Sequence, residues 1–90
     1  MFKLIFTQSY EKRAARFLKK HRDLESIYKK TLQLLEINPY HPSLRLHTLT
    51  GNNDGLHSVS INLKYRITLE FLMSEKMIIP VNVGSHDQVY

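Results

Sequence analysis

The second half of the chain alternates apolar and polar residues along three consecutive segments, and this pattern limits the fold more than any other feature of the sequence. The segments are 58–63, 65–71 and 77–83. Their alternating apolar residues are Val59, Ile61 and Leu63, then Tyr65, Ile67, Leu69 and Phe71, and finally Ile79, Val81 and Val83. Because successive side chains of a strand point to opposite faces, we predict a sheet with one apolar face and one solvent-exposed face. Pro80 has no N–H to donate and predicts an edge or a bulge in the last strand.

The solvent-exposed face of this sheet is where functional side chains are expected first. By the same alternation it carries Ser58, Ser60, Asn62, Arg66, Thr68 and Glu70. A face with an arginine among hydroxyl and amide groups is a plausible bed for a sugar-phosphate chain. The alternative is that Arg66 and Glu70 simply pair with each other on an ordinary solvated surface.

Two amphipathic helices are predicted before these strands. Their apolar residues recur at helical spacing, as Tyr10, Ala14, Phe17 and Leu18 in the first helix and Leu24, Ile27, Tyr28, Leu34 and Leu35 in the second. Thr7 or Ser9 is expected to cap the first helix, and Asp23 the second. The link between them is short, so the helices should form an antiparallel hairpin that covers the apolar face of the sheet. With extended segments at 2–6 and 43–49, the predicted order is β-α-α-β-β-β, an α+β fold.

The charge of the chain favours a negatively charged partner. Thirteen Lys and Arg residues against eight Asp and Glu residues give a formal net charge of +5 at pH 7. An excess of this size attracts phosphates, but it is also compatible with a solvated surface that keeps a small protein soluble. The Lys and Arg residues of the first helix are interpreted in this second way, as a solvated or partner-facing surface.

Several kinds of chemistry are disfavoured by what the sequence lacks. The absence of cysteine excludes disulfides and thiolate catalysis, and it fits a reducing compartment. The three glycines form no phosphate-binding loop, and the five histidines include no His-x-x-x-His pair, so neither a cofactor nor a metal is expected. No apolar run approaches the ~20 residues of a membrane span. The first ten residues are too polar after Phe6 for a signal peptide, and we expect a cytoplasmic protein that does not bind membranes.

The remaining polar residues suit metal-free cleavage of RNA. In that reaction the 2′-OH of the RNA attacks the adjacent phosphate, while a base removes its proton and an acid protonates the leaving oxygen. A cation stabilises the charge that develops on the phosphate. His47, His86, Arg66 and Tyr90 are candidates for these roles. The alternative is that His47 and His86 are ordinary surface residues of loops.

Three stretches of the sequence together resemble a known family. They are Leu46–Gly51, Tyr65–Arg66 and Val83–Tyr90. In this order and spacing they resemble the RelE/ParE superfamily, the toxins of bacterial type II toxin–antitoxin modules, and most of all its YafQ-like and RelE-like branch of mRNA interferases. The resemblance implies one domain over residues 1–90, with a helical hairpin packed on one face of a small, mainly antiparallel sheet.

The resemblance also implies an activity, partners and a set of residues. Such toxins cleave mRNA in the ribosomal A site, which implies mRNA, ribosomal RNA and a cognate antitoxin as partners. The matching catalytic positions are His47 and His86 for acid–base work, Arg66 for the phosphate and Tyr90 for positioning the RNA. The positions expected to contact RNA are Arg45, His57 and Lys64. Which histidine is the base and which the acid stays open.

The match to the pattern of the family is incomplete. Ser60 stands where YafQ-like toxins have a histidine, and Lys64 stands where they have an acidic residue. His57 and Ser58 stand where RelE-like toxins have lysines. Two alternatives are therefore compatible with the same fold, namely a ParE-like inhibitor of DNA gyrase without enzymatic activity and an inactive toxin that binds its antitoxin.

Overall fold

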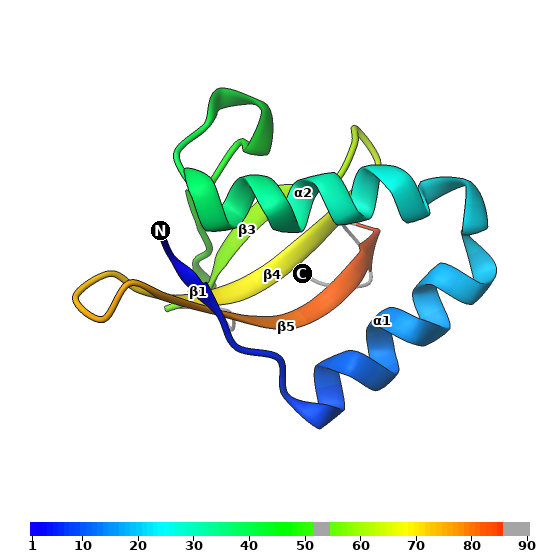
Figure 1. Ribbon diagram of the computed structural model, residues 1–90, viewed down its shortest axis with the longest axis horizontal. Helices are drawn as coiled ribbons and strands as arrows, with labels where there is room; N and C mark the ends of the chain where they lie inside the picture. The colour runs from blue at the N-terminus through cyan, green and yellow to red at the C-terminus, as the bar shows by residue number, and fades with distance from the viewer. Residues whose placement is uncertain (52–54, 86–90) are drawn as a thin grey trace.

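The computed structural model describes residues 1–51 and 55–85, which form two helices on a five-stranded sheet (Figure 1). The elements in chain order are β1 (Lys3–Leu4), α1 (Gln8–Lys20), the 3-10 turn η1 (Arg22–Leu24), α2 (Glu25–Ile37), the 3-10 turn η2 (Pro42–Leu44), β2 (His47–Thr48), β3 (His57–Ser60), β4 (Tyr65–Leu72) and β5 (Met77–Ser85). The strand order is β1-β5-β4-β3-β2, antiparallel throughout except that β1 runs parallel to β5. The predicted α+β fold with a mainly antiparallel sheet is confirmed. Only two residues of the segment 43–49 pair as a strand, because its start is taken up by η2.

Helix α1 packs on the sheet through the apolar residues that its sequence pattern predicts. Tyr10, Ala14 and Phe17 are buried. Thr7 is the N-cap, and its hydroxyl oxygen accepts a hydrogen bond from the backbone N–H of Tyr10 at 3.1 Å. Basic residues occupy the last turn, where the partial negative charge of the helix C-terminus favours them. The cap and the apolar spacing are therefore enough to explain where this helix lies.

Helix α2 begins differently from the prediction. Asp23 was expected as its N-cap, but this residue lies inside η1 and the helix starts at Glu25 with no side-chain cap. The chain makes its turn with 3-10 hydrogen bonds, which takes Asp23 out of the capping position. Tyr28, Thr31 and Leu35 face the core. The two helices diverge from η1 like the arms of a V (Figure 1), and the hydroxyl groups of Tyr10 and Tyr28 join them by a buried hydrogen bond of 2.7 Å.

Strand β5 contains the irregularity that its proline predicts. Thr68 pairs with Asn82 and Leu69 pairs with Pro80, so Val81 has no partner in the ladder between β4 and β5. This bulge shifts the alternation by one residue. The expected apolar series Ile79, Val81 and Val83 is therefore wrong. The β5 residues that are buried against the helices are Ile78, Pro80 and Val83.

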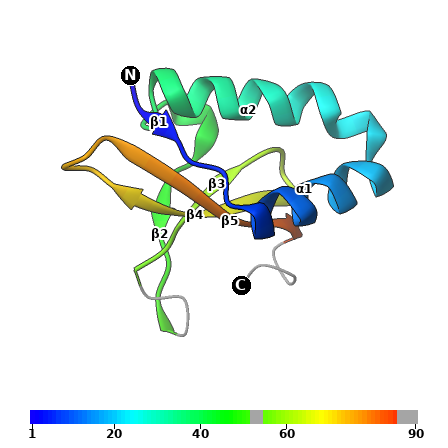
Figure 2. The same cartoon turned by 60° about the horizontal axis from the view of Figure 1, so that its bottom comes forward.

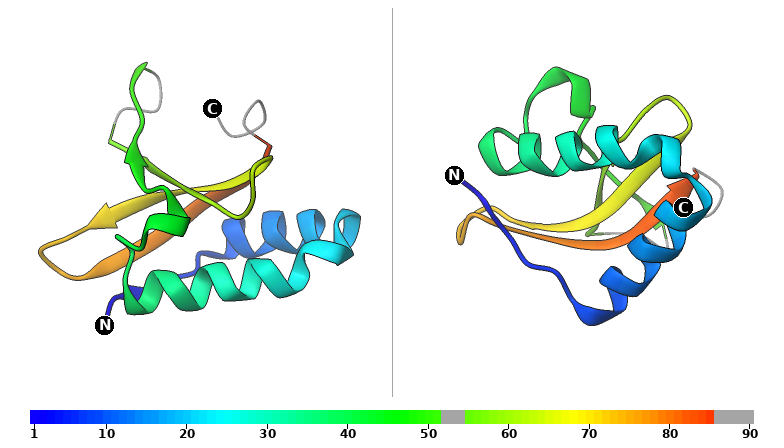
Figure 3. Two further views of the ribbon diagram at one scale, coloured as in Figure 1. Left: turned by 90° about the horizontal axis from the view of Figure 1, so that it is seen from above. Right: turned by 45° about the vertical axis from the view of Figure 1, so that its right-hand side comes forward.

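Both helices lie on the same side of the sheet, and the other side carries no helix in the described residues (Figures 2 and 3). The apolar residues between the layers form one core cluster that includes Leu35, Val59, Ile67, Leu69 and Ile78, each fully buried. No helix in the described part of the chain is both long enough and apolar enough to cross a membrane. The face without helices positions the candidate site described next.

Candidate functional site

Cross-strand pairing aligns the polar side chains on the sheet face without helices. Paired residues of neighbouring strands point to the same side. One row across four strands contains His47, Ser58, Thr68 and Asn82. A second row contains Ser60, Arg66 and Gly84. We call these two rows the polar face.

The centre of the polar face is less exposed than the sequence indicates. Ser58, Ser60 and Thr68 were expected to face solvent, but all three are buried, with exposed fractions of 0%, 6% and 1%. All three are short side chains on the interior strands β3 and β4, so a neighbouring strand flanks each of them on both sides. The hydroxyl of Thr68 donates to the carbonyl oxygen of Asn82 at 3.5 Å. The accessible part of the polar face therefore consists mainly of its longer side chains, such as His47 and Arg66, while the hydroxyl groups are buried.

Arg66 is held in place on this face by a hydroxyl group. Its Nη1 donates to Oγ of Ser60 at 3.0 Å across the strand pair. The ion pair with Glu70 that the sequence allows does not form; the only ion pair among the described residues joins Lys29 and Glu25. The guanidinium group is half-buried and keeps further N–H donors for a ligand. An arginine without a carboxylate partner, fixed by one hydrogen bond, is well suited to bind a phosphate.

His47 is oriented by the backbone of its own loop. Its Nδ1 lies 3.0 Å from the carbonyl oxygen of Arg45. A carbonyl oxygen only accepts, so Nδ1 carries the proton and Nε2 carries the lone pair of the neutral ring. Two strand spacings and two residues separate the backbone positions of His47 and Arg66, roughly 12 Å by the usual dimensions of a sheet. Strand pairing puts their side chains on the same face.

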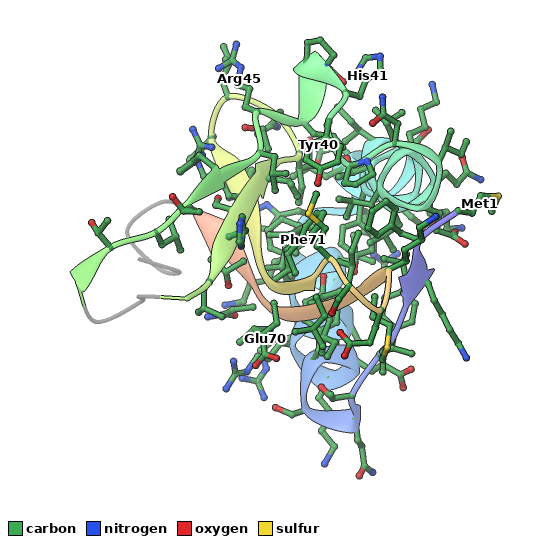
Figure 4. The ribbon with its side chains drawn as sticks, turned by 90° about the vertical axis from the view of Figure 1, so that its left-hand side faces the viewer. Met1, Tyr40, His41, Arg45, Glu70 and Phe71 are labelled. Carbon is green, nitrogen blue, oxygen red and sulfur yellow. The ribbon has the colours of Figure 1, made fainter. Side chains whose placement is uncertain are left out.

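Arg45 and Lys64 border the polar face from two loops. Arg45 has a left-handed backbone conformation with φ of 50°, and its side chain projects outward at the end of η2 (Figure 4). It lines a hollow of about 450 Å³ together with Ser60, the residue that holds Arg66. Lys64 lies in the turn between β3 and β4, with its Nζ 5.4 Å from the ring centre of Tyr65. Arg45 therefore lies next to the residue that holds Arg66, whereas Lys64 contacts the ring of Tyr65, which packs against Phe17 and His21.

His57 lies on the opposite side of the sheet from His47 and Arg66. It is two residues before Val59 on β3, so its side chain points to the same face as that of Val59. Its ring packs against Phe71, with ring centres 5.4 Å apart. His57, Phe71 and Tyr40 line a second hollow, separate from the one beside Arg45. Tyr40 also packs on Phe71, and Figure 4 shows these two residues near each other. Nδ1 of His57 is buried without a hydrogen-bond partner. Burial, and secondarily the nearby His47, lower the pKa of His57 below its ordinary value.

This lowered pKa predicts a loss of stability in acid. Between the ordinary histidine pKa of ~6.5 and the lower folded value, the unfolded chain binds a proton that the folded chain does not. The stability that His57 contributes is therefore present above ~6.5 and lost as the pH falls through the folded pKa. In urea unfolding at pH 7.5 and pH 5.0, His57→Leu should lose less stability on acidification than the wild type. His41→Gln, at an exposed loop position, is the control, and equal losses in all three proteins would contradict the prediction.

A basic pocket that sequence reasoning missed lies beside the polar face. It has a volume of about 270 Å³ and is lined by Arg13, Arg16, Phe17, Lys20, His21, Asn82 and Val83. We call it the α1–β5 pocket. Helical spacing puts its three cationic residues on one face of α1, but only the tertiary packing of α1 beside β5 makes a pocket of them.

Two predicted site residues, His86 and Tyr90, lie outside the described residues. Within the described part of the chain, no group of three or more histidine, aspartate or glutamate residues could hold a metal ion. The site that can be described therefore consists of His47 and Arg66 on the polar face, with Arg45 and Lys64 at its border.

Comparison with known proteins relates this fold to bacterial toxins. No protein-family model and no curated protein sequence matches the chain. Among solved structures, YafQ from E. coli superimposes with a TM-score of 0.80 at 15% identity, covering 100% of this chain and 99% of YafQ. The E. coli DinJ–YafQ toxin–antitoxin complex gives 0.77 at 18% identity, covering 99% and 97%. A YoeB/ParE toxin from Agrobacterium tumefaciens gives 0.74 at 15% identity, covering 94% and 99%. The chain thus has the fold of these toxins over its whole length.

Proposed function

We propose that the protein is the toxin of a type II toxin–antitoxin module and acts as a ribosome-dependent mRNA endonuclease in the cytoplasm. The observation that carries the proposal is that strand pairing puts His47 and Arg66 on the same polar face of a fold shared with YafQ. The motif order described above, which includes His86 and Tyr90, adds to it. A cognate antitoxin is the expected protein partner, as in the DinJ–YafQ complex.

The proposed reaction needs no group from outside the protein and its RNA. Neutral His47 takes the proton of the 2′-OH through Nε2, since its Nδ1 proton is directed to the Arg45 carbonyl oxygen. The 2′-oxygen attacks phosphorus, and the bond to the leaving 5′-oxygen breaks. His86, in its protonated form, donates a proton to that oxygen. The products are a 2′,3′-cyclic phosphate and a free 5′-OH.

Arg66 and Tyr90 have supporting roles in this scheme. Negative charge grows on the non-bridging oxygens as the 2′-oxygen attacks, and the guanidinium group of Arg66 stabilises it. The hydrogen bond from Arg66 to Ser60 fixes one end of the guanidinium group before the substrate arrives, which reduces the cost of ordering it. Tyr90 positions the RNA. Arg45 and Lys64 attract the flanking phosphates.

The proposal is tested by mapping new 5′ ends in a defined mRNA by primer extension, with purified ribosomes and purified protein. We expect cuts that appear only in translated message and that disappear in His86→Ala. Intact message with normal translation would contradict the proposed endonuclease. In that case, inhibition of DNA supercoiling by purified gyrase would indicate a ParE-like inhibitor. Binding to an antitoxin without either activity would indicate an inactive toxin.

A further inference from the structure

Among the described residues, the cations of the α1–β5 pocket have no acidic partners. Arg16 and Lys20 make no ion pair with any acidic residue of the described chain. Arg13 donates from Nη1 to the carbonyl oxygen of Val81 at 3.1 Å, so its guanidinium group is anchored to the bulge of β5. Cations gathered without counterions repel one another, and a bound anion relieves that repulsion.

One side of the pocket is built from packed aromatic rings. Phe17 and His21, which line the pocket, contact each other and Tyr65, with ring centres 4.7 to 5.2 Å apart. This cluster joins the end of α1 to the start of β4, so these two side chains are held by packing before a ligand binds. A site whose side chains are already held loses less entropy on binding than one whose side chains must be ordered.

The pocket and the polar face share one residue, Asn82. Asn82 lines the pocket and belongs to the same cross-strand row as His47. Thr68, the partner of Asn82 on β4, lies two residues from Arg66 on the same strand face. A chain that leaves the polar face over β5 therefore enters the pocket, and an RNA strand presents a phosphate at every nucleotide along that path.

We propose that the α1–β5 pocket binds a backbone phosphate of the RNA strand at a position away from the scissile bond, and that this phosphate sets the register of the strand on the polar face. The inference rests on the proposed function for the identity of the RNA. The repeated phosphates of a nucleic acid suit a site that continues a surface already bearing Arg66. An acidic peptide is the alternative that the experiment must exclude.

The test compares two double variants of α1 that remove the same charge. Arg16→Gln/Lys20→Gln alters the pocket, whereas Lys12→Gln/Lys19→Gln alters exposed residues of the same helix that do not line it. The probe is a short RNA with 2′-O-methyl riboses, which cannot be cleaved. The pocket variant should bind this RNA about tenfold more weakly, and the log–log slope of affinity against salt should fall by ~0.7 for each phosphate that the pocket no longer neutralises. The control variant should bind like the wild type.

Three outcomes would overturn or separate the claims. Equal RNA affinity and salt dependence in the two double variants would show that the pocket is not a phosphate site. Binding of an oligoglutamate peptide that depends on Arg16 and Lys20, with unchanged RNA binding, would assign the pocket to an acidic protein partner and overturn the proposal. Loss of RNA affinity in the pocket variant, in a protein that cleaves no translated message, would support the pocket and contradict the endonuclease. Thermal unfolding of both variants verifies that they fold.

Discussion

Replacing His47 by alanine is expected to slow RNA cleavage by about 10²–10⁴-fold, the contribution of a positioned general base or acid. The side chain is exposed, so its loss should leave the fold intact. Because the Nδ1 proton points to the carbonyl oxygen of Arg45, Nε2 is the nitrogen that acts as base. Single-turnover cleavage of translated message by the wild type and by His47→Ala measures the difference in rate.

The control for this prediction is another exposed histidine nearby in the sequence. His41 lies in the loop before η2, where its Nδ1 is 2.8 Å from the hydroxyl oxygen of Ser43. His41→Ala should cleave at the wild-type rate. If His47→Ala also cleaved at the wild-type rate, the base would have to be another group, and the hydrogen bond between His47 and Arg45 would have no role in catalysis.

The helices and their buried faces could be predicted because the signals are local. A spacing of three to four residues puts Tyr10, Ala14 and Phe17 on one side of any helix, whatever the helix packs against. The N-cap at Thr7 depends only on residues within one turn. The predicted start of α2 was wrong because a 3-10 turn and a capped helix are alternative structures for the same few residues around Asp23. Their difference in free energy is small and depends on the packing of both helices.

The strands show what periodicity predicts and what it does not. Alternation predicted which β3 and β4 residues face the core, and Val59, Ile67 and Leu69 are fully buried there. In β5 the bulge at Val81 shifts by one residue which side chains face the core. Pro80 indicated an irregularity without giving its position or direction. From the sequence alone, a shift of one residue in the strand register would move His57 from one face of the sheet to the other. Strand pairing with β4 fixes it on the helix side, and no local pattern contains that information.

The site itself could be predicted only in part. The residues of the polar face follow from alternation, but their burial depends on which strands flank them in the sheet, as it does for Ser58 and Thr68 on the interior strands β3 and β4. The α1–β5 pocket joins residues of α1 with Asn82, far away in the sequence. Its signal in the sequence was the cationic side of α1, which was interpreted as a solvated surface. A pocket made by tertiary packing has no spacing that a sequence pattern can detect.

Replacing Arg66 by alanine should lower the rate of cleavage by about 10²–10³-fold, the usual effect of removing one preorganised donor to a developing oxyanion. Arg66→Lys keeps the charge but loses the paired N–H donors, so it should recover only part of the rate. Ser60→Ala removes the hydroxyl group that fixes the guanidinium group, and it should reduce the rate less than Arg66→Ala does. Single-turnover cleavage of mRNA on programmed ribosomes, with saturating protein, measures the chemical step in each case.

The three variants separate a role in catalysis from a role in folding or in simple attraction of RNA. If Arg66 acts on the reacting phosphate, Ser60→Ala should add little to the defect of Arg66→Ala, because the two residues work through one guanidinium group. Arg22→Ala, at an exposed position in η1, removes one positive charge elsewhere and should leave the rate unchanged. Full activity in Arg66→Lys would mean that charge alone suffices. Full activity in Arg66→Ala would remove Arg66 from the mechanism and, with it, the geometric basis for the proposed endonuclease.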